Sequence, residues 1–414
     1  MVINMCEYNN VPKIRFKGFT DVWEQRKLGD LMDITSVKRI HQSDWTESGI
    51  RFLRARDIVA DYKKEEVEDK LYISKEKYEE YSLISGKVQI GDLLVTGVGT
   101  IGIPYLIRNN EPIYFKDGNI IWFKNNNKID DNFLYYSFVG SKIQNFINEK
   151  SGVGTVGTYT IQSGKETPIM LTSNNEQRKI SNLMSNLDNL ITLHQRKCDN
   201  LINVKKSLLE KMFPKNSSNI PEIRFKGFTD VWEQRKLNEL CNIYDGTHQT
   251  PNYKDSGIMF LSVENIKDLS SNKYISYEDF KKNFKVYPEK NDILMTRIGD
   301  IGTTNIVKEN SLKAYYVSLA LLKCRSINPY YLNFAIKSDY VQNGLKLRSL
   351  LTAIPMKINK DQIGEVDINY PIDPEEQSNI GKLFDNLDNL ITLHQRKLEK
   401  LKNIKKSMLE KMFV

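Results

Sequence analysis

The segment PKIRFKGFTDVWEQRKL, Pro12–Leu28, occurs a second time as PEIRFKGFTDVWEQRKL, Pro221–Leu237. Over the longer stretches Pro12–Leu31 and Pro221–Leu240, 17 of 20 positions agree. A second block, NLDNLITLHQRKCDNLINVKKSLLEKMF, recurs 200 residues later with 22 of 28 positions the same. Internal repeats mark repeated structural units, so the chain is predicted to contain two copies of one plan.

Between the repeated ends the two halves differ, but a common skeleton remains. SGIRFLRARDI, Ser48–Ile58, matches SGIMFLSVENI, Ser256–Ile266. GDLLVTGVGTIGI, Gly91–Ile103, matches NDILMTRIGDIGT, Asn291–Thr303. Apolar runs punctuated by glycine are typical of strands joined by tight turns. We therefore expect the two halves to share a fold and to differ in their exposed surfaces.

The second repeated block predicts a long helix in each half. Leucine, isoleucine and other apolar residues recur with heptad spacing from Ile180 and from Ile380, and Pro214 ends the first series. This pattern is typical of a coiled coil, and two copies in one chain most simply pair antiparallel about a pseudo-twofold axis. A helix of ~38 residues spans roughly 55–60 Å. The predicted helix–helix interface consists of Leu183, Leu187, Leu190, His194, Leu201, Leu208, Leu383, Leu387, Leu390, His394, Leu401 and Met408.

The fold class predicted from these observations is α+β. Two similar globular mixed α/β domains are separated by two long helices that form an antiparallel coiled coil. The predicted boundaries are 1–31 for a conserved frame segment, 32–173 for the first domain, 174–213 for the first helix, 214–221 for a linker, 222–240 for the repeated frame segment, 241–373 for the second domain and 374–414 for the second helix.

Composition limits the classes of function. The 414 residues carry a formal net charge of +8, which suits a polyanionic partner but also fits proteins that bind none. The N-terminal residues lack the apolar stretch of a signal peptide and no run is long enough for a membrane helix, so we expect a cytoplasmic protein. The four cysteines lie far apart without a C-x-x-C pair, which indicates neither a disulfide framework nor a zinc site.

Three patterns resemble catalytic or ligand-binding motifs. The G-x-G-x-x-G matches at Gly97–Gly102 and Gly152–Gly157 are not followed by a helical pattern, so tight turns explain them better than a dinucleotide site. His194 and His394 occupy equivalent positions in the helix pair, where a polar residue fixes register, and we expect this role rather than metal binding. Asn328–Tyr331 has the sequence NPYY, which resembles the Asn-Pro-Pro-Tyr motif of DNA adenine methyltransferases, although Asn328 and Pro329 also suit a helix start. We predict no catalytic residues, bound cofactor or metal in this chain.

Polar and basic residues in the divergent regions are the candidates for DNA recognition. Arginine, asparagine, glutamine, histidine and threonine side chains read base edges, whereas lysines and backbone amides hold phosphates. The alternative for any single residue is an ordinary solvated loop. The predicted DNA-binding residues are Lys38, Arg39, His41, Gln42, Arg51, Arg54, Arg56, Thr96, Thr100, Thr155, Thr158, Tyr159, Thr247, His248, Gln249, Thr250, Asn252, Tyr253, Arg297, Asp300 and Thr303.

The order of divergent domain, repeated helix, divergent domain and repeated helix resembles the specificity subunit of type I restriction-modification systems. The GDLL and NDIL motifs at Gly91 and Asn291 and the helix starts EQRKI, Glu176–Ile180, and EEQSNI, Glu375–Ile380, are similar to marks of that family. The resemblance covers essentially the whole chain. One departure is Arg297, which stands where the first half has Gly97.

The resemblance implies that each divergent segment is a target recognition domain for one half of a bipartite, non-palindromic DNA sequence. The partners implied are double-stranded DNA, two copies of a methyltransferase subunit and translocating endonuclease subunits. SAM, ATP and magnesium would belong to those partners. Two alternatives stay open at this point, a self-sufficient DNA adenine methyltransferase using Asn328–Tyr331 and a structural scaffold without sequence-specific DNA contact.

Overall fold

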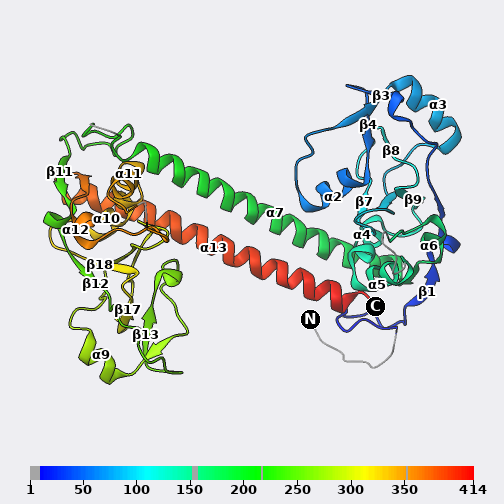
Figure 1. Cartoon of the computed structure of the whole chain (residues 1–414). Coiled ribbons are helices and arrows are strands. Elements are labelled where there is room, and N and C mark those ends of the chain that lie inside the picture. The colour runs from blue at the N-terminus through cyan, green and yellow to red at the C-terminus, as the bar shows by residue number, and fades with distance from the viewer. Residues whose placement is uncertain (1–9, 152–156, 216–217, 351–352) are drawn as a thin grey trace. The chain divides into compact units, whose positions relative to one another are not determined.

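The computed structural model describes residues 10–151, 157–215, 218–350 and 353–414 (Figure 1). The chain forms two compact units, unit 1 with Met1–His194 and Lys397–Val414, and unit 2 with Gln195–Arg396. Each unit contains one mixed α/β domain and one end of each long helix. These helices are α7, Asn174–Lys211, and α13, Pro374–Met412.

The domain of unit 1 is built on two four-stranded sheets, with strand orders β2-β9-β6-β7 and β3-β5-β4-β8, and on the antiparallel pair β1-β10. Among the described residues of unit 1, β4 and β8 are the only strands that pair in parallel, as their counterparts β13 and β17 do in unit 2. The elements are β1 (Glu24–Lys27), α1 (Leu28–Leu31), β2 (Asp33–Thr35), η1 (Gln42–Asp44), β3 (Trp45–Thr46), β4 (Ile50–Leu53), α2 (Ala55–Lys63), β5 (Leu71–Ile73), α3 (Lys75–Ser85), β6 (Leu93–Thr96), β7 (Pro104–Leu106), β8 (Ile113–Phe115), β9 (Ile120–Lys124), α4 (Asp131–Val139), α5 (Ser141–Lys150), α6 (Ile161–Glu166) and β10 (Pro168–Leu171).

The domain of unit 2 repeats this plan with a four-stranded sheet β12-β18-β15-β16, a three-stranded sheet β14-β13-β17 and the pair β11-β19. Among its described residues it has no counterpart of α2, and a single bridge between Lys254 and Tyr274 takes the place of β3. The elements are β11 (Glu233–Lys236), α8 (Leu237–Leu240), β12 (Cys241–Asp245), β13 (Ile258–Leu261), η2 (Val263–Asn265), β14 (Tyr274–Ile275), α9 (Tyr277–Asn283), β15 (Ile293–Thr296), β16 (Thr304–Ile306), β17 (Lys313–Tyr315), β18 (Leu319–Cys324), α10 (Pro329–Ile336), α11 (Asp339–Leu347), α12 (Lys360–Gly364) and β19 (Asp367–Tyr370).

Local sequence signals explain why the divergent domains keep one fold. The central strands β6 and β15 are buried at every residue, as expected for strands with apolar neighbours on both faces. Ser74 and Ser276 occupy equivalent N-cap positions, where each hydroxyl accepts a bond from a backbone N–H of the first turn, at 3.1 and 3.0 Å. Buried strands and caps are thus repeated even where the loops are not.

Each repeated frame segment is fastened to the start of a long helix by a buried ion pair. In unit 1 the Arg15 guanidinium donates to both carboxylate oxygens of Glu176, with N–O distances of 2.7 and 2.8 Å. In unit 2 Arg224 donates to Glu376 at 2.6 and 2.7 Å. Both glutamate side chains are inaccessible to solvent, so water weakens neither pair.

The same frame segments bind the C-terminal ends of the helices. The Ile14 N–H donates to the Lys411 carbonyl near the end of α13 at 3.0 Å, and the Ile223 N–H donates to the Lys211 carbonyl at the end of α7 at 2.9 Å. The last carbonyls of a helix have no partner within the helix, so these bonds satisfy them. Each frame segment therefore holds the start of one long helix and the end of the other.

The glutamine after each buried glutamate joins the long helix to its domain. Gln177 Oε1 accepts from the N–H of Asp130, the N-cap of α4, at 3.0 Å. Gln377 Oε1 accepts from the N–H of Asn328, the N-cap of α10, at 2.8 Å. The Glu-Gln pair at each helix start thus has a structural role in both units.

The paired ends of α7 and α13 run antiparallel within each unit. In unit 1 Lys405, late in α13, donates to Asp188, early in α7, at 2.6 Å. In unit 2 Lys205, late in α7, donates to Asp388, early in α13. The fold class is therefore the one expected, with two mixed α/β domains and two long antiparallel helices.

The seam between the helices has a different phase from the one predicted. Ile191 is 9% and Cys198 is 2% exposed, whereas Leu190 is 43% and Leu390 is 44% exposed. The prediction that Leu190 and Leu390 lie in the interface is wrong, because the seam passes through the residue that follows each of them. A heptad pattern admits either phase, and the direction in which the neighbouring helix lies selects one.

The residues of the seam follow from their burial. In α7 and the residue that follows it, the series that is buried or half-buried throughout is Ile180, Met184, Leu187, Ile191, His194, Cys198, Leu201, Lys205, Leu208 and Met212. The other predicted interface residues, Leu183, Leu187, His194, Leu201, Leu208, Leu383, Leu387, His394, Leu401 and Met408, are buried or half-buried.

Replacing Arg15 by alanine is expected to lower the free energy of unfolding of unit 1 by about 3–5 kcal/mol, because it leaves Glu176 buried without its partner. Chemical denaturation measures the loss. Arg26→Ala is the control, since Arg26 pairs with Glu24 at 3.4 Å on the exposed surface and should cost less than about 1 kcal/mol. Equal losses from the two substitutions would contradict a structural role for the buried pair.

Replacing Ile191 by asparagine is expected to lower the free energy of unfolding by about 2–4 kcal/mol, since it buries an amide at the seam. The same change at the neighbouring Leu190 should cost about 1 kcal/mol or less, because that side chain faces solvent. Urea denaturation gives the free energy of unfolding of both variants, and the larger loss identifies the position that lies in the seam. A larger loss for Leu190→Asn would restore the phase expected from the sequence.

Candidate nucleic-acid interface

The loop before β3 carries the first group of predicted DNA-binding residues. Its exposed side chains are those of Lys38, Arg39, His41 and Gln42. The loop backbone is fixed, because the Tyr114 hydroxyl donates to the Lys38 carbonyl at 2.8 Å and the His41 N–H donates to the Asp44 carboxylate at 3.0 Å. Exposed side chains on a fixed backbone suit recognition, since little order has to be gained on binding.

Arg51 and Arg54 are used mainly inside the domain. Arg51 lies 3.4 Å and Arg54 3.3 Å from the carboxylate of the buried Asp57. Arg51 also donates to the carbonyls of Phe52 and Leu71, both at 2.9 Å. These contacts fix the turn from β4 into α2, and Arg56 on the first turn of α2 is the exposed arginine of the three.

Three of the predicted DNA-binding residues are buried, and the prediction is corrected for them. Thr96 donates to the Thr100 carbonyl at 2.6 Å and accepts from the Ile103 N–H at 2.9 Å, which closes the turn after β6. The Tyr159 hydroxyl shares a hydrogen bond with Thr167 at 2.5 Å in the core. Arg297 is the third buried residue. Side chains already bonded in the interior are not available to a ligand outside.

The second domain has Arg297 where the first has Gly97, and the arginine fits there because its side chain has partners within the domain. The Gly97 carbonyl accepts from the Tyr159 N–H at 2.9 Å, and the Arg297 carbonyl accepts from the Ile358 N–H at 3.0 Å, so the backbone pairing is the same. The Arg297 guanidinium pairs with Asp245 and donates to the Ile358 carbonyl at 3.2 Å. The sequence contained a signal for this, because the Asp245 carboxylate replaces Ser36 at the equivalent position of the first half.

The loop after β12 carries the second group of predicted residues. Thr247 is half-buried, and its N–H donates to the Tyr315 carbonyl at 3.1 Å while its carbonyl accepts from the Val317 N–H at 3.0 Å. The side chains that follow it and are exposed are His248, Gln249, Thr250, Asn252 and Tyr253. The loop is therefore attached at its base and presents polar side chains at its tip.

Tight turns supply the remaining candidates. Thr100 and Asp300 are exposed at equivalent turns, and the Thr303 hydroxyl donates to Asp300 at 2.7 Å. Thr158 is exposed and forms a bridge with Val98 beside the first of these turns. Thr155 lies outside the described residues.

Lys357 is a candidate that the sequence alone did not single out. It is exposed and forms bridges with Ile298 and Leu350, so it lies beside the turn that carries Asp300. Its distance along the chain from Ile298 hides this neighbourhood, and only strand pairing reveals it. A lysine at this place suits a phosphate contact.

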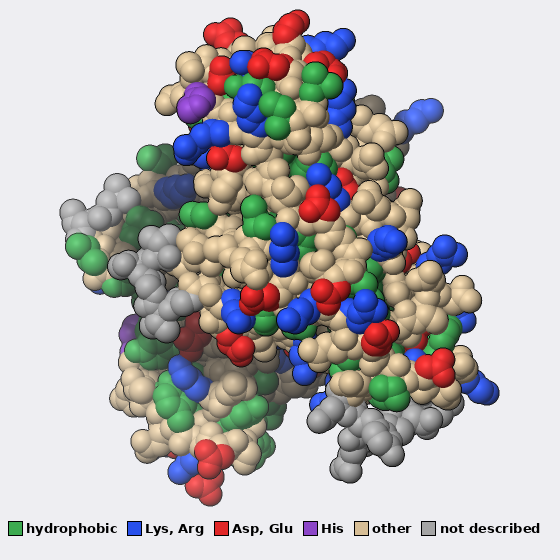
Figure 2. Space-filling model, turned by 90° about the vertical axis from the view of Figure 1, so that its right-hand side faces the viewer, with side chains coloured by type: hydrophobic (Ala, Val, Ile, Leu, Met, Phe, Trp, Pro, Cys, Tyr) green, Lys and Arg blue, Asp and Glu red, His purple; other side chains and the backbone are tan. Residues whose placement is uncertain are grey.

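The charged side chains on one face of the molecule are mixed in sign. Figure 2 shows lysine and arginine side chains interspersed with aspartate and glutamate side chains over the face drawn there. Among the residues coloured by type, the basic ones do not gather into one stripe on that face. The exposed polar loops therefore define the candidate interface better than net charge does.

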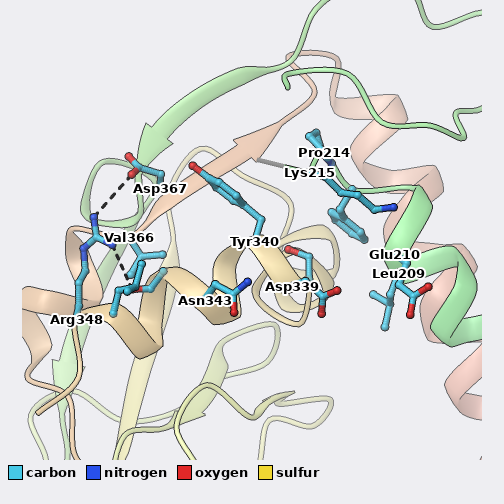
Figure 3. Close-up of a pocket in the computed structure, with 14 residues that line it drawn as sticks. Leu209, Glu210, Pro214, Lys215, Asp339, Tyr340, Asn343, Arg348, Val366 and Asp367 are labelled. Carbon is cyan, nitrogen blue, oxygen red and sulfur yellow. Dashed lines mark hydrogen bonds and ion pairs between the residues drawn. The ribbon is translucent and has the colours of Figure 1, made fainter. Parts of the chain in front are cut away.

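A pocket of about 500 Å³ lies in unit 2 where α7 ends, between α11 and β19 (Figure 3). Arg348 lies 3.9 Å from Asp367 at one side, and Glu210 and Asp339 lie at the other. The pocket lining holds no histidine or cysteine that could act with these carboxylates. Its side chains do not form a nucleophile-and-base arrangement.

The NPYY segment forms a helix start. Asn328 Oδ1 accepts from the N–H groups of Tyr330 and Tyr331, at 3.0 and 3.2 Å, and Pro329 is the first helical residue of α10. The Tyr331 side chain is buried and its hydroxyl donates to the Asn369 carbonyl at 2.7 Å. Because the motif's side chains are bonded within the fold, the segment does not present them to a nucleobase.

Among residues 10–151, 157–215, 218–350 and 353–414, no group of three or more histidine, cysteine, aspartate or glutamate side chains is placed to hold a metal ion. Within the same ranges, no helix combines the length and apolarity needed to cross a membrane.

Comparisons with known proteins agree with the fold. The family model described as type I restriction modification DNA specificity domain matches residues 20–203 and 229–403. The type I restriction enzyme MjaVIII specificity subunit of Methanocaldococcus jannaschii is 23% identical over 302 residues, which are 68% of this chain and 69% of that protein.

Two solved structures share the fold at low identity. The S subunit of a type I restriction-modification system from M. genitalium is 17% identical, with a TM-score of 0.59 over 98% of this chain and 99% of that one. A chain from a structure of complex assembly and conformational transition of the type I R-M system is 17% identical, with a TM-score of 0.51 over 94% and 96% of the two chains.

Replacing Arg297 by alanine is expected to lower the free energy of unfolding of unit 2 by about 1–3 kcal/mol, because the buried guanidinium loses its pair with Asp245 and its hydrogen bond to the Ile358 carbonyl. The double variant Arg297→Ala/Asp245→Ser should recover part of that loss, since it has no arginine–aspartate ion pair to lose, like the first domain with Gly97 and Ser36. Thermal unfolding of both variants measures the coupling. Additive losses would contradict the pairing.

Proposed function

Because the chain belongs to the family of type I restriction modification DNA specificity domains, we propose that it is a specificity subunit that reads a bipartite, non-palindromic DNA sequence. It has no catalytic role of its own in this proposal. It directs methyltransferase and endonuclease subunits to the site in the cytoplasm.

One observation carries the proposal. Two domains with the same buried strands, helix caps and frame contacts differ in the loops that they expose. Equivalent scaffolds with different polar loops suit the reading of two different half-sites, since sequence is read by side chains at base edges. The 38-residue helix α7 leads along the chain from the first domain to the second, and we propose that it sets the gap between the half-sites.

The side chains proposed to contact DNA are the exposed or half-exposed members of the predicted set, apart from Arg51 and Arg54, which pair with Asp57 inside the domain. Amides, hydroxyls and imidazoles at the loop tips are candidates for base contacts, and the basic groups are candidates for phosphate contacts. In the first domain they are Lys38, Arg39, His41, Gln42, Arg56, Thr100 and Thr158, and in the second Thr247, His248, Gln249, Thr250, Asn252, Tyr253, Asp300 and Thr303.

Two copies of a methyltransferase subunit are the proposed protein partners. Leu190 and Leu193 on α7 and the identical Leu390 and Leu393 on α13 are exposed, which is unusual for leucines on a helix that already packs along its other side. Because these pairs lie in the repeated block, they offer the same apolar surface twice. SAM, ATP and magnesium belong to the partners in this proposal.

Co-expression of the chain with its cognate methyltransferase is expected to produce adenine methylation at one bipartite motif. Exchanging residues 32–170 for those of another family member should change one half of that motif and leave the other half and the spacer unchanged. Methylation mapping by long-read sequencing reads all three. A change in both halves, or a continuous palindromic motif, would contradict the proposal.

Point substitutions separate the two kinds of contact. Gln249→Ala is expected to relax the sequence preference within one half-site by about 1–3 kcal/mol if the glutamine contacts a base. Lys357→Ala should weaken binding to all sequences alike, since a phosphate contact carries no base information. Binding of the assembled complex to a panel of DNA duplexes distinguishes them, and equal affinity for every duplex would favour a scaffold without sequence-specific contact.

A further inference from the structure

Unit 2 contains a cleft of about 920 Å³ between its domain and the paired helices. Its walls are the residues 266–269 that follow η2, β16 with the residues that follow it, the end of α10, and α13 from Asp385 to Arg396, together with Lys205 of α7. The Asn305 side chain on β16 donates to the carbonyls of Ile266 and Lys267 at 3.0 and 2.9 Å, so this short segment covers only one edge of the cleft. Apolar side chains, among them Ile306, Phe334 and Ile391, line part of it. A mixed lining of this kind suits a protein segment rather than a small ligand.

In unit 1 the helix α2 occupies the equivalent place. It packs against β7, the counterpart of β16 (Figure 1). Lys64, which caps α2, donates to the Thr192 hydroxyl on α7 at 2.8 Å. Unit 2 has no such helix, because Ile258–Ile275 is six residues shorter than the equivalent Ile50–Ile73. The cleft therefore exists because one short segment differs in length between the two domains.

The charged groups around α2 indicate which side chains a bound segment needs at this place. Burial raises the pKa of Asp61 on α2, and the positive charge of Arg108 opposes that shift. Burial also raises the pKa of Tyr62 on α2, and the Asp188 carboxylate adds to it. The α2 helix thus places the Asp61 carboxylate within the electrostatic influence of Arg108, and the Tyr62 hydroxyl within that of Asp188 on α7.

Unit 2 has counterparts of Arg108 and Asp188 and one further cation. Lys308 is the counterpart of Arg108, and Asp388 is the counterpart of Asp188. Lys337 stands where the first half has Val139, and burial together with the Lys205 charge lowers its pKa to about 8. The Lys337 ammonium lies 4.9 Å from the Phe334 ring and has no hydrogen bond or ion pair with any residue that the structure describes.

A second observation also points to a bound group. Asn333 lines the cleft and is 4% exposed, and its side-chain oxygen is buried without a hydrogen-bond donor among the described residues. A buried amide oxygen without a donor costs free energy, and a donor supplied from outside would remove that cost. Lys337 and Asn333, four residues apart at the end of α10, thus leave a cation and an acceptor without partners among the described residues.

Resting on the function proposed above, we propose that this cleft receives an acidic helical segment of one methyltransferase subunit. The segment lies at the place that α2 occupies in unit 1. One of its carboxylates lies near Lys308 and Lys337, much as the Asp61 carboxylate lies within the electrostatic influence of Arg108. The two methyltransferase copies then dock by the same repeated helix surface but differ at this contact, because α2 already fills the place in unit 1.

Charge argues against DNA as the occupant. The lining contains six lysine and arginine side chains and four aspartate and glutamate side chains. Two of those carboxylates, Asp385 and Asp388, are held in ion pairs with Lys308 and Lys205 at the cleft wall. A phosphate backbone would meet these carboxylates, whereas a helix with groups of both kinds can match them, as α2 does.

Native mass spectrometry of the chain mixed with its methyltransferase tests the inference. The unmutated chain is expected to bind two copies, and Lys337→Met should weaken the second copy about tenfold or more, so that the 1:1 complex dominates at concentrations where the unmutated chain is doubly bound. Lys337→Arg keeps the charge and should keep the second copy. Lys282→Met on α9, which removes an exposed lysine of the same unit, is the matched control and should behave as the unmutated chain.

The variant is suited to the test because methionine preserves the contact with Phe334 and removes a charge that burial disfavours, so the thermal stability of the free chain should not fall. Retention of both copies at unchanged affinity by Lys337→Met overturns the inference. Loss of DNA affinity with both copies retained overturns it too and assigns the cleft to DNA. If the unmutated chain binds no methyltransferase, the proposed function fails, and the inference fails with it.

Discussion

A buried arginine–glutamate pair attaches the start of each long helix to its frame segment. Arg15 and Arg224 each bring a frame segment to a glutamate that solvent does not reach, and a backbone N–H of the same segment donates to a carbonyl at the end of the other long helix. A buried charge without its partner is costly, so arrangements that separate the two charges are less stable. The pair therefore fixes where each helix leaves its domain and beside which helix end it lies.

This constraint explains why the two halves are conserved in some places and divergent in others. The frame segments and the helix starts contact one another through side chains that must match in shape and charge, so both copies keep them. The loops at the strand ends make few such contacts and differ freely. Where a divergent residue does enter the core, as Arg297 does, it comes with a partner in Asp245 that makes the change tolerable. A shared frame with independent loops suits a protein that reads two different half-sites.

The two units are not equivalent where a short segment differs in length. In unit 1 the segment between β4 and β5 is long enough to form α2, which packs against β7 and reaches α7 through Lys64. In unit 2 the corresponding segment forms only η2, and lysines and carboxylates line an open cleft instead. A difference of a few residues in a loop thus changes what the surface can bind while the frame stays the same.

The two-domain plan, the long helices and the repeated frame could be predicted from the sequence, because nearly identical segments in one chain adopt the same local structure and meet the same neighbours. The sequence also indicated the helix start at Asn328, since an asparagine followed by proline suits an N-cap. The phase of the seam could not be predicted, because the heptad pattern allows Leu190 or Ile191 to face inward and the neighbouring helix selects Ile191. The same holds for Thr96, Tyr159 and Arg297, whose polar groups find partners that are distant in the chain and so are withdrawn from the surface.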